Sequence, residues 1–190
     1  MSFRNLVIGN RSFRRFDEQF VIDRDTLIEL VGLARYAASG RNAQPLKYFI
    51  SCDPVLNGEI FPALAWAGYL KEWPGPKEGE RPSAYIVVLL DKSISDGFFC
   101  DDGIAMQNIL LGAVEKGLGG CIIRSINKPQ LTSILQLPAN LDILDVVALG
   151  KPIEKVVITN VGEGGDIKYY RDENGVHYVP KRSLDELIVK

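Results

Sequence analysis

The sequence predicts one globular domain of the α/β or α+β class, with a central sheet wrapped in helices. Its 190 residues, of which 46% are apolar and 24% charged, are enough to close a hydrophobic core without disulfides or metal ions. Helical and strand-like patterns alternate along the chain, and the strands are few and short. No internal repeat divides it, and the Pro- and Gly-rich stretch at 73–82 is too short to be a linker. We therefore expect residues 1–190 to form a single domain.

The first half of the chain predicts a helix followed by two strands. Residues 25–38 carry apolar side chains at helical spacing behind an Asp suited to capping, which predicts a helix. Residues 47–52 are aromatic and β-branched and stop at Asp53 and Pro54, which predicts a strand. The continuous apolar run at 85–90 predicts a second strand that is buried more deeply.

The second half opens with the most apolar helix of the chain, at 101–117. Because apolar residues lie on nearly every side of it, we expect this helix to be buried in the domain or partly against a second subunit. The remaining pattern predicts a strand at 121–126, a helix at 127–137, a strand at 145–149 and a hairpin at 169–179 around Asn174 and Gly175.

The composition excludes several classes of chemistry. The chain has one histidine, so a two-histidine metal site is not available and any Ser-His-Asp machinery would have to use His177 alone. We expect His177, beside the hairpin turn, to be a packing or surface residue. The three cysteines are an odd number without CxxC spacing, which indicates a reducing, cytoplasmic compartment. We expect no metal site.

Charge and hydropathy exclude two classes of partner. The formal net charge of −2 gives no electrostatic footprint for nucleic acid or an anionic membrane. The longest apolar run, at 84–90, is far short of the roughly 20 residues needed to cross a bilayer, and no signal sequence opens the chain. The glycine patterns at 117–122 and 162–167 do not complete a dinucleotide fingerprint, so a Rossmann or P-loop site is not expected.

Three polar clusters are candidate binding sites, and each also has a simpler interpretation. Residues 10–16 concentrate Arg and Ser donors that suit a phosphate, or form a solvated basic stretch. Residues 38–46 offer amide side chains to a planar heteroatom-rich ring, or form a capped turn after a helix. Residues 179–183 complete a phosphate site if the fold brings the two ends of the chain together, while Ser183 also fits a helix N-cap with Glu186.

These clusters, taken in order, resemble motifs of the flavin-dependent nitroreductase family over nearly the whole chain. Residues 11–16 resemble its R-S-x-[RK]-x-F motif, and residues 39–45 resemble S-x-x-N-x-Q-P-W. Residues 102–111 resemble its central dimer helix, and 117–121 the segment beside the flavin ring. Lys181 and Arg182 match its C-terminal phosphate-binding cations. Asn10, where many members carry a second arginine, and Leu46, in place of the usual Trp, depart from the pattern.

The resemblance implies an α+β nitroreductase-like fold with a central mixed sheet wrapped by helices, and a homodimer that holds FMN non-covalently at the subunit interface. The phosphate end would be bound by Arg11, Ser12, Lys181 and Arg182, with Arg14 at the phosphate or at the N1/C2=O edge of the ring. Ser39, Gly40, Asn42 and Gln44 would reach the ring and ribityl chain from the partner subunit. The 121–124 segment, including Ile122 and Ile123, would offer backbone N–H groups near the ring.

The function implied is an FMN-dependent oxidoreductase of the nitroreductase type. NADH or NADPH would give a hydride to flavin N5 and leave, and a nitroaromatic, quinone or similar electron-poor small molecule would then take the electrons in a ping-pong cycle. No catalytic side chain is expected, because the chemistry occurs at flavin N5. Two alternatives stay open: a flavin-binding or flavin-free regulatory module without turnover, and a family member with different chemistry such as reductive dehalogenation.

Overall fold

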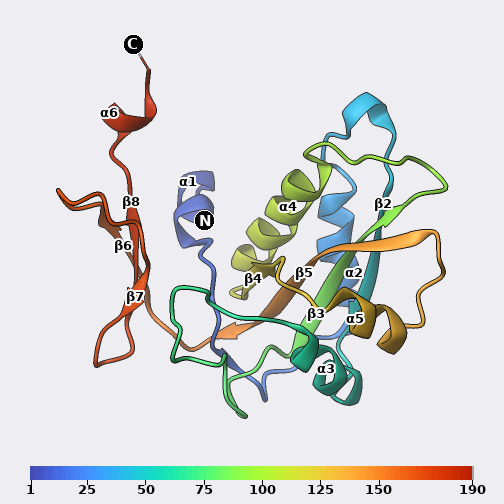
Figure 1. The fold of residues 1–190 in the computed structure, drawn as a ribbon, viewed down its shortest axis with the longest axis horizontal. Coiled ribbons are helices and arrows are strands. Elements are labelled where there is room, and N and C mark those ends of the chain that lie inside the picture. Colours follow the sequence, from blue (N-terminus) through green and yellow to red (C-terminus); the bar gives the residue numbers. More distant parts are fainter. Residues whose placement is uncertain (190) are drawn as a thin grey trace.

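A central five-stranded sheet organises the protein, whose computed structural model describes residues 1–189 (Figure 1). Its strands are β1 (Phe16–Asp17), β2 (Leu46–Ser51), β3 (Ala84–Asp91), β4 (Gly119–Ile123) and β5 (Leu141–Pro152). They lie in the order β1-β5-β3-β2, and β4 also pairs with β5. The four ladders are β1–β5, β2–β3, β3–β5 and β4–β5, and all of them are antiparallel.

The expected mixed central sheet is therefore corrected to an antiparallel one. Val147 of β5 pairs with Ile86 of β3 and with Ile122 of β4, so β5 lies between these two strands. The connection through the helix at 101–115 does bring β4 parallel to β3. Because β5 fills the space between them, however, each strand pairs antiparallel to β5 instead of parallel to the other.

Helices cover both faces of this sheet. On one face, α2 (Arg24–Ala34) and α4 (Asp101–Glu115) pack against one set of alternate residues of β3, which includes Ile86. On the other face, α3 (Pro54–Ile60) and α5 (Lys128–Ile134) pack with the other set, which includes Tyr85. Side chains of a strand point alternately to its two faces, so a strand buried on one face alternates apolar and polar residues. Because β3 is buried on both faces, its sequence is apolar without interruption.

The three predicted helices form where expected, but all end earlier than predicted, α4 at Glu115 instead of 117 and α5 at Ile134 instead of 137. The Asp23 carboxylate accepts a hydrogen bond from the Thr26 backbone N–H at 2.7 Å and begins α2. That helix was predicted to reach residue 38 but ends at Ala34, because Ser39 takes an extended conformation to join the following loop. At the C-terminus of α4, Gly117 has φ 72° and lets the chain leave the helix towards β4.

A C-terminal arm stands apart from the central sheet, at the left of Figure 1. It consists of β6 (Val156–Asn160), β7 (Tyr170–Arg171), β8 (His177–Lys181) and α6 (Leu184–Leu187). In its small mixed sheet, β6 is parallel to β8 and β7 is antiparallel to β8. The β7–β8 pair confirms the hairpin predicted around Asn174 and Gly175, where Gly175 supplies a φ of 75°.

The remaining short elements connect the main ones. The N-terminal α1 (Phe3–Gly9) contacts α4 and lies between α4 and the arm (Figure 1). Two 3₁₀ turns, η1 (Gly40–Asn42) and η2 (Phe61–Ala63), follow α2 and α3. Within residues 1–189, no helix has the length and apolar character that a membrane crossing requires.

The close approach of β4 to its neighbours gives a test of the packing. A Cβ on Gly120 would lie 2.6 Å from the Ala148 carbonyl oxygen and 2.7 Å from a Leu110 methyl carbon. Gly120→Ala should therefore lower the free energy of unfolding by about 1–3 kcal/mol through overpacking. Urea denaturation measures this change. Gly162→Ala is the control, since nothing lies within 4 Å of its Cβ, and equal midpoints for the two variants would contradict the packing at β4.

Candidate functional site

The N-terminal segment and the C-terminal arm enclose a pocket of about 340 Å³. The two segments run side by side in Figure 1, although they lie at opposite ends of the sequence. The pocket also reaches α4 and β4. It is lined by Asn10, Arg11, Ser12, Arg14, Gln107, Leu110, Ile122, Val156, Tyr169, His177, Val179 and Lys181. The fold thus brings together Arg11, Ser12 and Arg14 with Lys181, as the sequence motifs required.

Unpaired positive charge dominates this pocket. In residues 1–189, no acidic side chain forms an ion pair with Arg11, Arg14 or Lys181. Arg11 donates from Nη2 to the Val7 carbonyl at 2.9 Å, but its buried Nε has no hydrogen-bond partner. Burial lowers the pKa of Arg11 from its ordinary value. Three cations with unused donors form a site suited to an anion with several oxygen atoms.

His177 lies fully buried in the wall of this pocket, which the sequence reasoning missed. Its Nε2 is 3.3 Å from Nη1 of Arg14. Burial, together with the charges of Arg14 and Arg171, lowers the pKa of His177 to about 4. A guanidinium can only donate, so the neutral ring accepts at Nε2 and carries its proton on Nδ1. The Nδ1 atom is buried without a partner, which leaves one more donor for a ligand.

Arg14 is oriented by aromatic as well as polar contacts. Its guanidinium carbon lies 4.9 Å from the centroid of the Tyr169 ring. The Tyr169 and His177 rings are 5.2 Å apart. Arg14 therefore lies between a π surface and an imidazole acceptor, both contributed by the arm. No sequence motif marks Tyr169 or His177 as a residue that contacts Arg14.

Glu154 links the N-terminal segment to the C-terminal arm. Its buried carboxylate accepts the backbone N–H groups of Arg14 and Arg15, and it forms an ion pair with Arg171 at 2.8 Å. The Arg171–Glu154 pair is desolvated, and the three charge-assisted hydrogen bonds satisfy the carboxylate. This residue fixes the backbone that carries Arg14, although the sequence offered no motif for it.

The 39–44 loop lies elsewhere in the chain, against the N-terminal end of α4. Ser39 Oγ donates to the buried Asp101 carboxylate at 2.6 Å, and the Gly40 N–H donates to it at 2.9 Å. Ser39 Oγ also accepts the Gln44 N–H at 2.8 Å. Asn42 and Gln44 adopt positive φ angles of 55° and 53°, a conformation that costs a non-glycine residue about 1 kcal/mol. The Asp101 hydrogen bonds stabilise this shape.

Within one chain, these loop residues do not reach the Arg11 pocket. Ser39 and Gln44 line a separate cavity beside α2 and α4, and Gly40 and Asn42 belong to the same loop. Their expected approach to the site from a partner subunit stays a prediction. Asp101, which organises the loop, was not among the predicted site residues, and the only signal in the sequence was its place at the start of the apolar helix predicted at 101–117.

The two predicted isoleucines lie on opposite sides of β4. Ile122 is exposed and lines the cationic pocket, while Ile123 is buried; both also line an adjoining cavity of about 190 Å³, together with Arg14 and Cys121. Burial raises the pKa of the Cys121 thiol, so the neutral thiol is favoured. One edge of β4 pairs with β5; the other carries, in the described chain, a single isolated bridge between Ser12 and Gly120.

Arg182 takes a different position from Lys181. Its guanidinium lies 3.2 Å from Glu186, one turn along α6, and it does not line the pocket. The Ser183 hydroxyl caps α6 together with Glu186, as the sequence predicted. In residues 1–189, no cluster of three or more His, Cys, Asp or Glu side chains could hold a metal ion.

Comparisons with known proteins agree on one family. The sequence profile of the Nitroreductase family matches residues 7–151. A protein of Archaeoglobus fulgidus, described as "Putative NADH dehydrogenase/NAD(P)H nitroreductase", is 27% identical over 155 residues, covering 77% of this chain and 83% of that protein.

Solved structures share the fold. The Nitroreductase Family Protein from Streptococcus pneumoniae TIGR4 superimposes with a TM-score of 0.72 at 16% identity, covering 100% of both chains. The FMN-dependent nitroreductase of Clostridium difficile R20291 has a TM-score of 0.65 at 18% identity, covering 80% of this chain and 89% of that one. The match over both full chains includes the C-terminal arm.

The buried imidazole predicts a pH dependence of stability. The pKa of His177 is about 4 in the folded protein and near 6.5 when unfolded, so between these values the unfolded chain binds more protons. The free energy of unfolding should therefore fall by about 1–3 kcal/mol as the pH decreases from 6.5 to 4. Urea titrations across this range measure it. In His177→Gln this component should vanish, and parallel curves for wild type and variant would contradict the assignment.

We predict that the hydrogen bonds to the Asp101 carboxylate keep the 39–44 loop in its observed conformation. Asp101→Ala removes both acceptors of Ser39 and Gly40 and should lower the free energy of unfolding by about 1–3 kcal/mol. Amide hydrogen exchange at residues 39–44 should accelerate, with little change in β3 and β5. Asp96→Asn, on an exposed loop, is the matched control. Unchanged exchange in Asp101→Ala would show that other contacts hold the loop.

Proposed function

Since the chain belongs to the nitroreductase family, we propose that it is an FMN-dependent oxidoreductase that uses NADH or NADPH to reduce nitroaromatics, quinones or similar electron-poor acceptors. The single observation that carries this proposal is the pocket in which Arg11, Arg14 and Lys181 converge, with no acidic partner among residues 1–189. Such a pocket suits a phosphate-bearing cofactor. The similar proteins described above, an NAD(P)H nitroreductase and an FMN-dependent nitroreductase, suggest the class of reaction.

The residues present fit the polar part of FMN. Arg11 Nε and His177 Nδ1 are buried donors without partners, and a phosphate or ribityl oxygen would satisfy them. The Ser12 hydroxyl and the Lys181 ammonium add donors on the same wall. Because a buried unsatisfied donor costs about 1–3 kcal/mol, satisfying these groups would contribute to cofactor affinity.

Each binding residue has a proposed role. Arg11, Ser12 and Lys181 would hold the phosphate, and Arg182 would join them by leaving Glu186. The backbone at Ile122 and Ile123 would offer N–H groups towards the ring. When bound, FMN would supply the redox chemistry between NADH or NADPH and the acceptor.

Arg14 would stabilise negative charge on the flavin ring, and His177 would position the Arg14 guanidinium. A guanidinium at the N1/C2=O edge stabilises the negative charge that develops there on reduction. The neutral His177 ring accepts a hydrogen bond from Arg14 without competing for negative charge, and Tyr169 supports the guanidinium from its π face. His177 and Tyr169 are therefore proposed as positioning residues.

A homodimer would complete the site. The helices α1 and α6 bury no residue within one chain, and Phe3 and Leu184 are 72% and 73% exposed. Ile104 of α4 is also exposed within one chain, so burial of this side of the helix would require a second subunit, which was one of the two expectations from the sequence. These apolar surfaces support an isologous dimer in which the 39–44 loop of one subunit approaches the Arg11 pocket of the other.

The phosphate assignment predicts the effect of single substitutions on cofactor binding. Arg11→Ala, Lys181→Ala and Arg182→Ala should each weaken FMN binding by about tenfold or more, because each removes a charge-assisted hydrogen bond. Equilibrium dialysis with free FMN measures the dissociation constant. Circular dichroism should show an unchanged fold, and Arg24→Gln, on the exposed start of α2, serves as control. Unaltered FMN affinity in all three variants would overturn the assignment.

Reduction of the bound flavin separates an enzyme from a binding module. FMN-loaded protein mixed anaerobically with NADH or NADPH should lose its flavin absorbance, and added nitroaromatic or quinone should restore it. If FMN binds but neither nicotinamide bleaches it, the chain is a flavin-binding module without turnover.

A further inference from the structure

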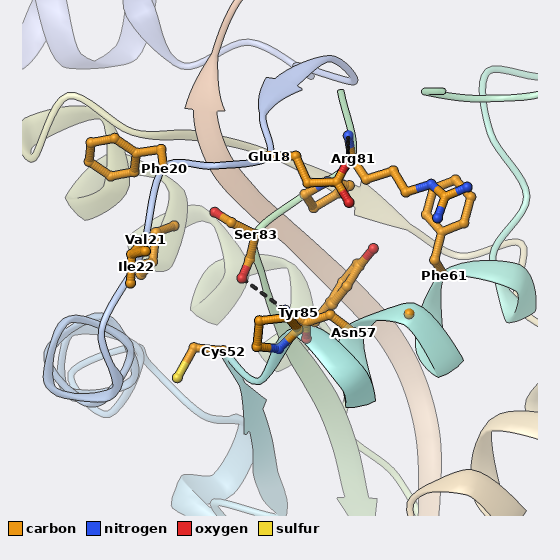
Figure 2. A pocket seen from close by; sticks show the side chains of 13 residues that line it. Glu18, Phe20, Val21, Ile22, Cys52, Asn57, Phe61, Arg81, Ser83 and Tyr85 are labelled. Atoms are coloured by element: carbon orange, nitrogen blue, oxygen red, sulfur yellow. Dashed lines mark hydrogen bonds between the residues drawn. The ribbon is translucent and has the colours of Figure 1, made fainter. Parts of the chain in front are cut away.

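A second cavity, of about 290 Å³, lies between residues 18–22, the start of α3 and residues 81–85. It shares no lining residue with the Arg11 pocket. Figure 2 shows its walls: the side chains come from the segment after β1, from α3 and from the chain entering β3. Val21, on the wall, is 81% exposed, so the cavity is open to solvent on this side. The proposed oxidoreductase chemistry uses none of these residues.

Much of the wall is apolar. Phe20, Ile22, Pro54 and Phe61 line it, together with the ring of Pro82. A cavity of about 150 Å³ is enough to hold benzene. The volume here therefore accommodates a single ring with a short polar substituent, and a larger ring system would exceed it.

Three polar atoms of the lining residues have no hydrogen-bond partner. They are Arg81 Nε, Ser83 Oγ and the Tyr85 hydroxyl, and all three are buried. All three can donate a hydrogen bond. By contrast, Asn57 is satisfied, because its amide donates to the Ser83 carbonyl at 2.8 Å and its oxygen accepts from Ser51 at 2.7 Å. Buried polar groups are nearly always paired, so the unpaired donors of Arg81 and Tyr85, which lie on the same side of the cavity (Figure 2), favour an acceptor beside them.

The Arg81 guanidinium supplies an unneutralised positive charge. It lies 4.5 Å from the centroid of the Phe61 ring, and it forms no ion pair with an acid in the described part of the chain. The Tyr85 side chain, only 1% exposed, points its hydroxyl towards Glu18 and Arg81 (Figure 2). Burial raises the pKa of Tyr85, the Glu18 charge raises it further, and the Arg81 charge lowers it. Both charges are therefore close to this hydroxyl.

Glu18 limits the charge that the cavity accepts. Its carboxylate already accepts hydrogen bonds from the backbone N–H groups of Gly79 and Arg81. It therefore does not need an ion pair with the Arg81 guanidinium to be satisfied. A ligand with two negative charges would still be repelled by it. One negative group beside Arg81, facing the Tyr85 hydroxyl, fits the charges present.

We propose that this cavity is a second ligand site, which binds a small monocarboxylate with a single aromatic ring. The planar carboxylate matches the planar donor fork of Arg81 and accepts from the Tyr85 hydroxyl, which points towards Arg81 (Figure 2). The ring packs against the apolar part of the wall.

Calorimetric titration with three matched probes tests the chemistry. Phenylacetate should bind to the FMN-loaded protein, phenylacetamide should bind about tenfold more weakly, and phenethylamine should not bind detectably, because only the first provides an anionic acceptor. Phenylacetate should bind equally to the protein with and without added FMN, which shows that the Arg11 pocket is not involved. Equal binding of acid and amide, or absence of phenylacetate binding at millimolar concentration, would overturn the proposal.

Substitutions in the wall test the residues. Arg81→Gln should weaken phenylacetate binding by about tenfold or more, and Tyr85→Phe by a smaller factor of about three to ten. Tyr85→Phe removes only an unpartnered oxygen, so its melting temperature should stay the same or rise. Glu18→Gln should strengthen binding, because it removes the repelling charge and keeps an acceptor for Gly79 and Arg81. Unchanged affinity in Arg81→Gln, or weaker binding in Glu18→Gln, would contradict the proposed carboxylate, with Arg24→Gln as the control.

Discussion

The buried carboxylate of Glu154 is the interaction on which the candidate site depends. It ties the backbone of Arg14 and Arg15 to Arg171 of the arm. Without it, two segments from opposite ends of the chain would present like charges to each other. A buried ion pair often contributes little net stability, because desolvation offsets attraction. Its contribution here is geometric, since it sets where Arg14 lies relative to His177.

This arrangement lets the pocket keep its positive charge. Arg11 and Arg14 have no acidic partner of their own, and the carboxylate that stabilises this region is bound to backbone N–H groups and to Arg171. His177 stays neutral because its burial and the nearby cations oppose protonation. The donors therefore remain available for an anion. A histidine with an ordinary pKa would add a charge that varies with pH in the physiological range.

The central sheet supports the two cavities from different sides. β5 lies between β3 and β4, so the Arg11 pocket is built on β4 while the Tyr85 cavity is built at the beginning of β3. The rigid strands hold both sets of residues, and the connecting segments supply the donors. Separate walls mean that a ligand in one site need not change the charge or shape of the other.

Local sequence determined most of the secondary structure and the main binding motif. Apolar periodicity located α2 and α4, the cap at Asp23 marked a helix start, and Asn174 with Gly175 specified a hairpin. These features depend on neighbouring residues only, so they can be inferred without a fold. The sequence also singled out Arg11, Ser12, Arg14 and Lys181, through their dense donors and their resemblance to family motifs, and the fold places all four around one pocket. Only the tertiary structure decided the antiparallel order around β5 and the roles of Glu154, His177 and Asp101. Those depend on contacts between residues distant in sequence, where burial and charge, and not local pattern, determine what a side chain does.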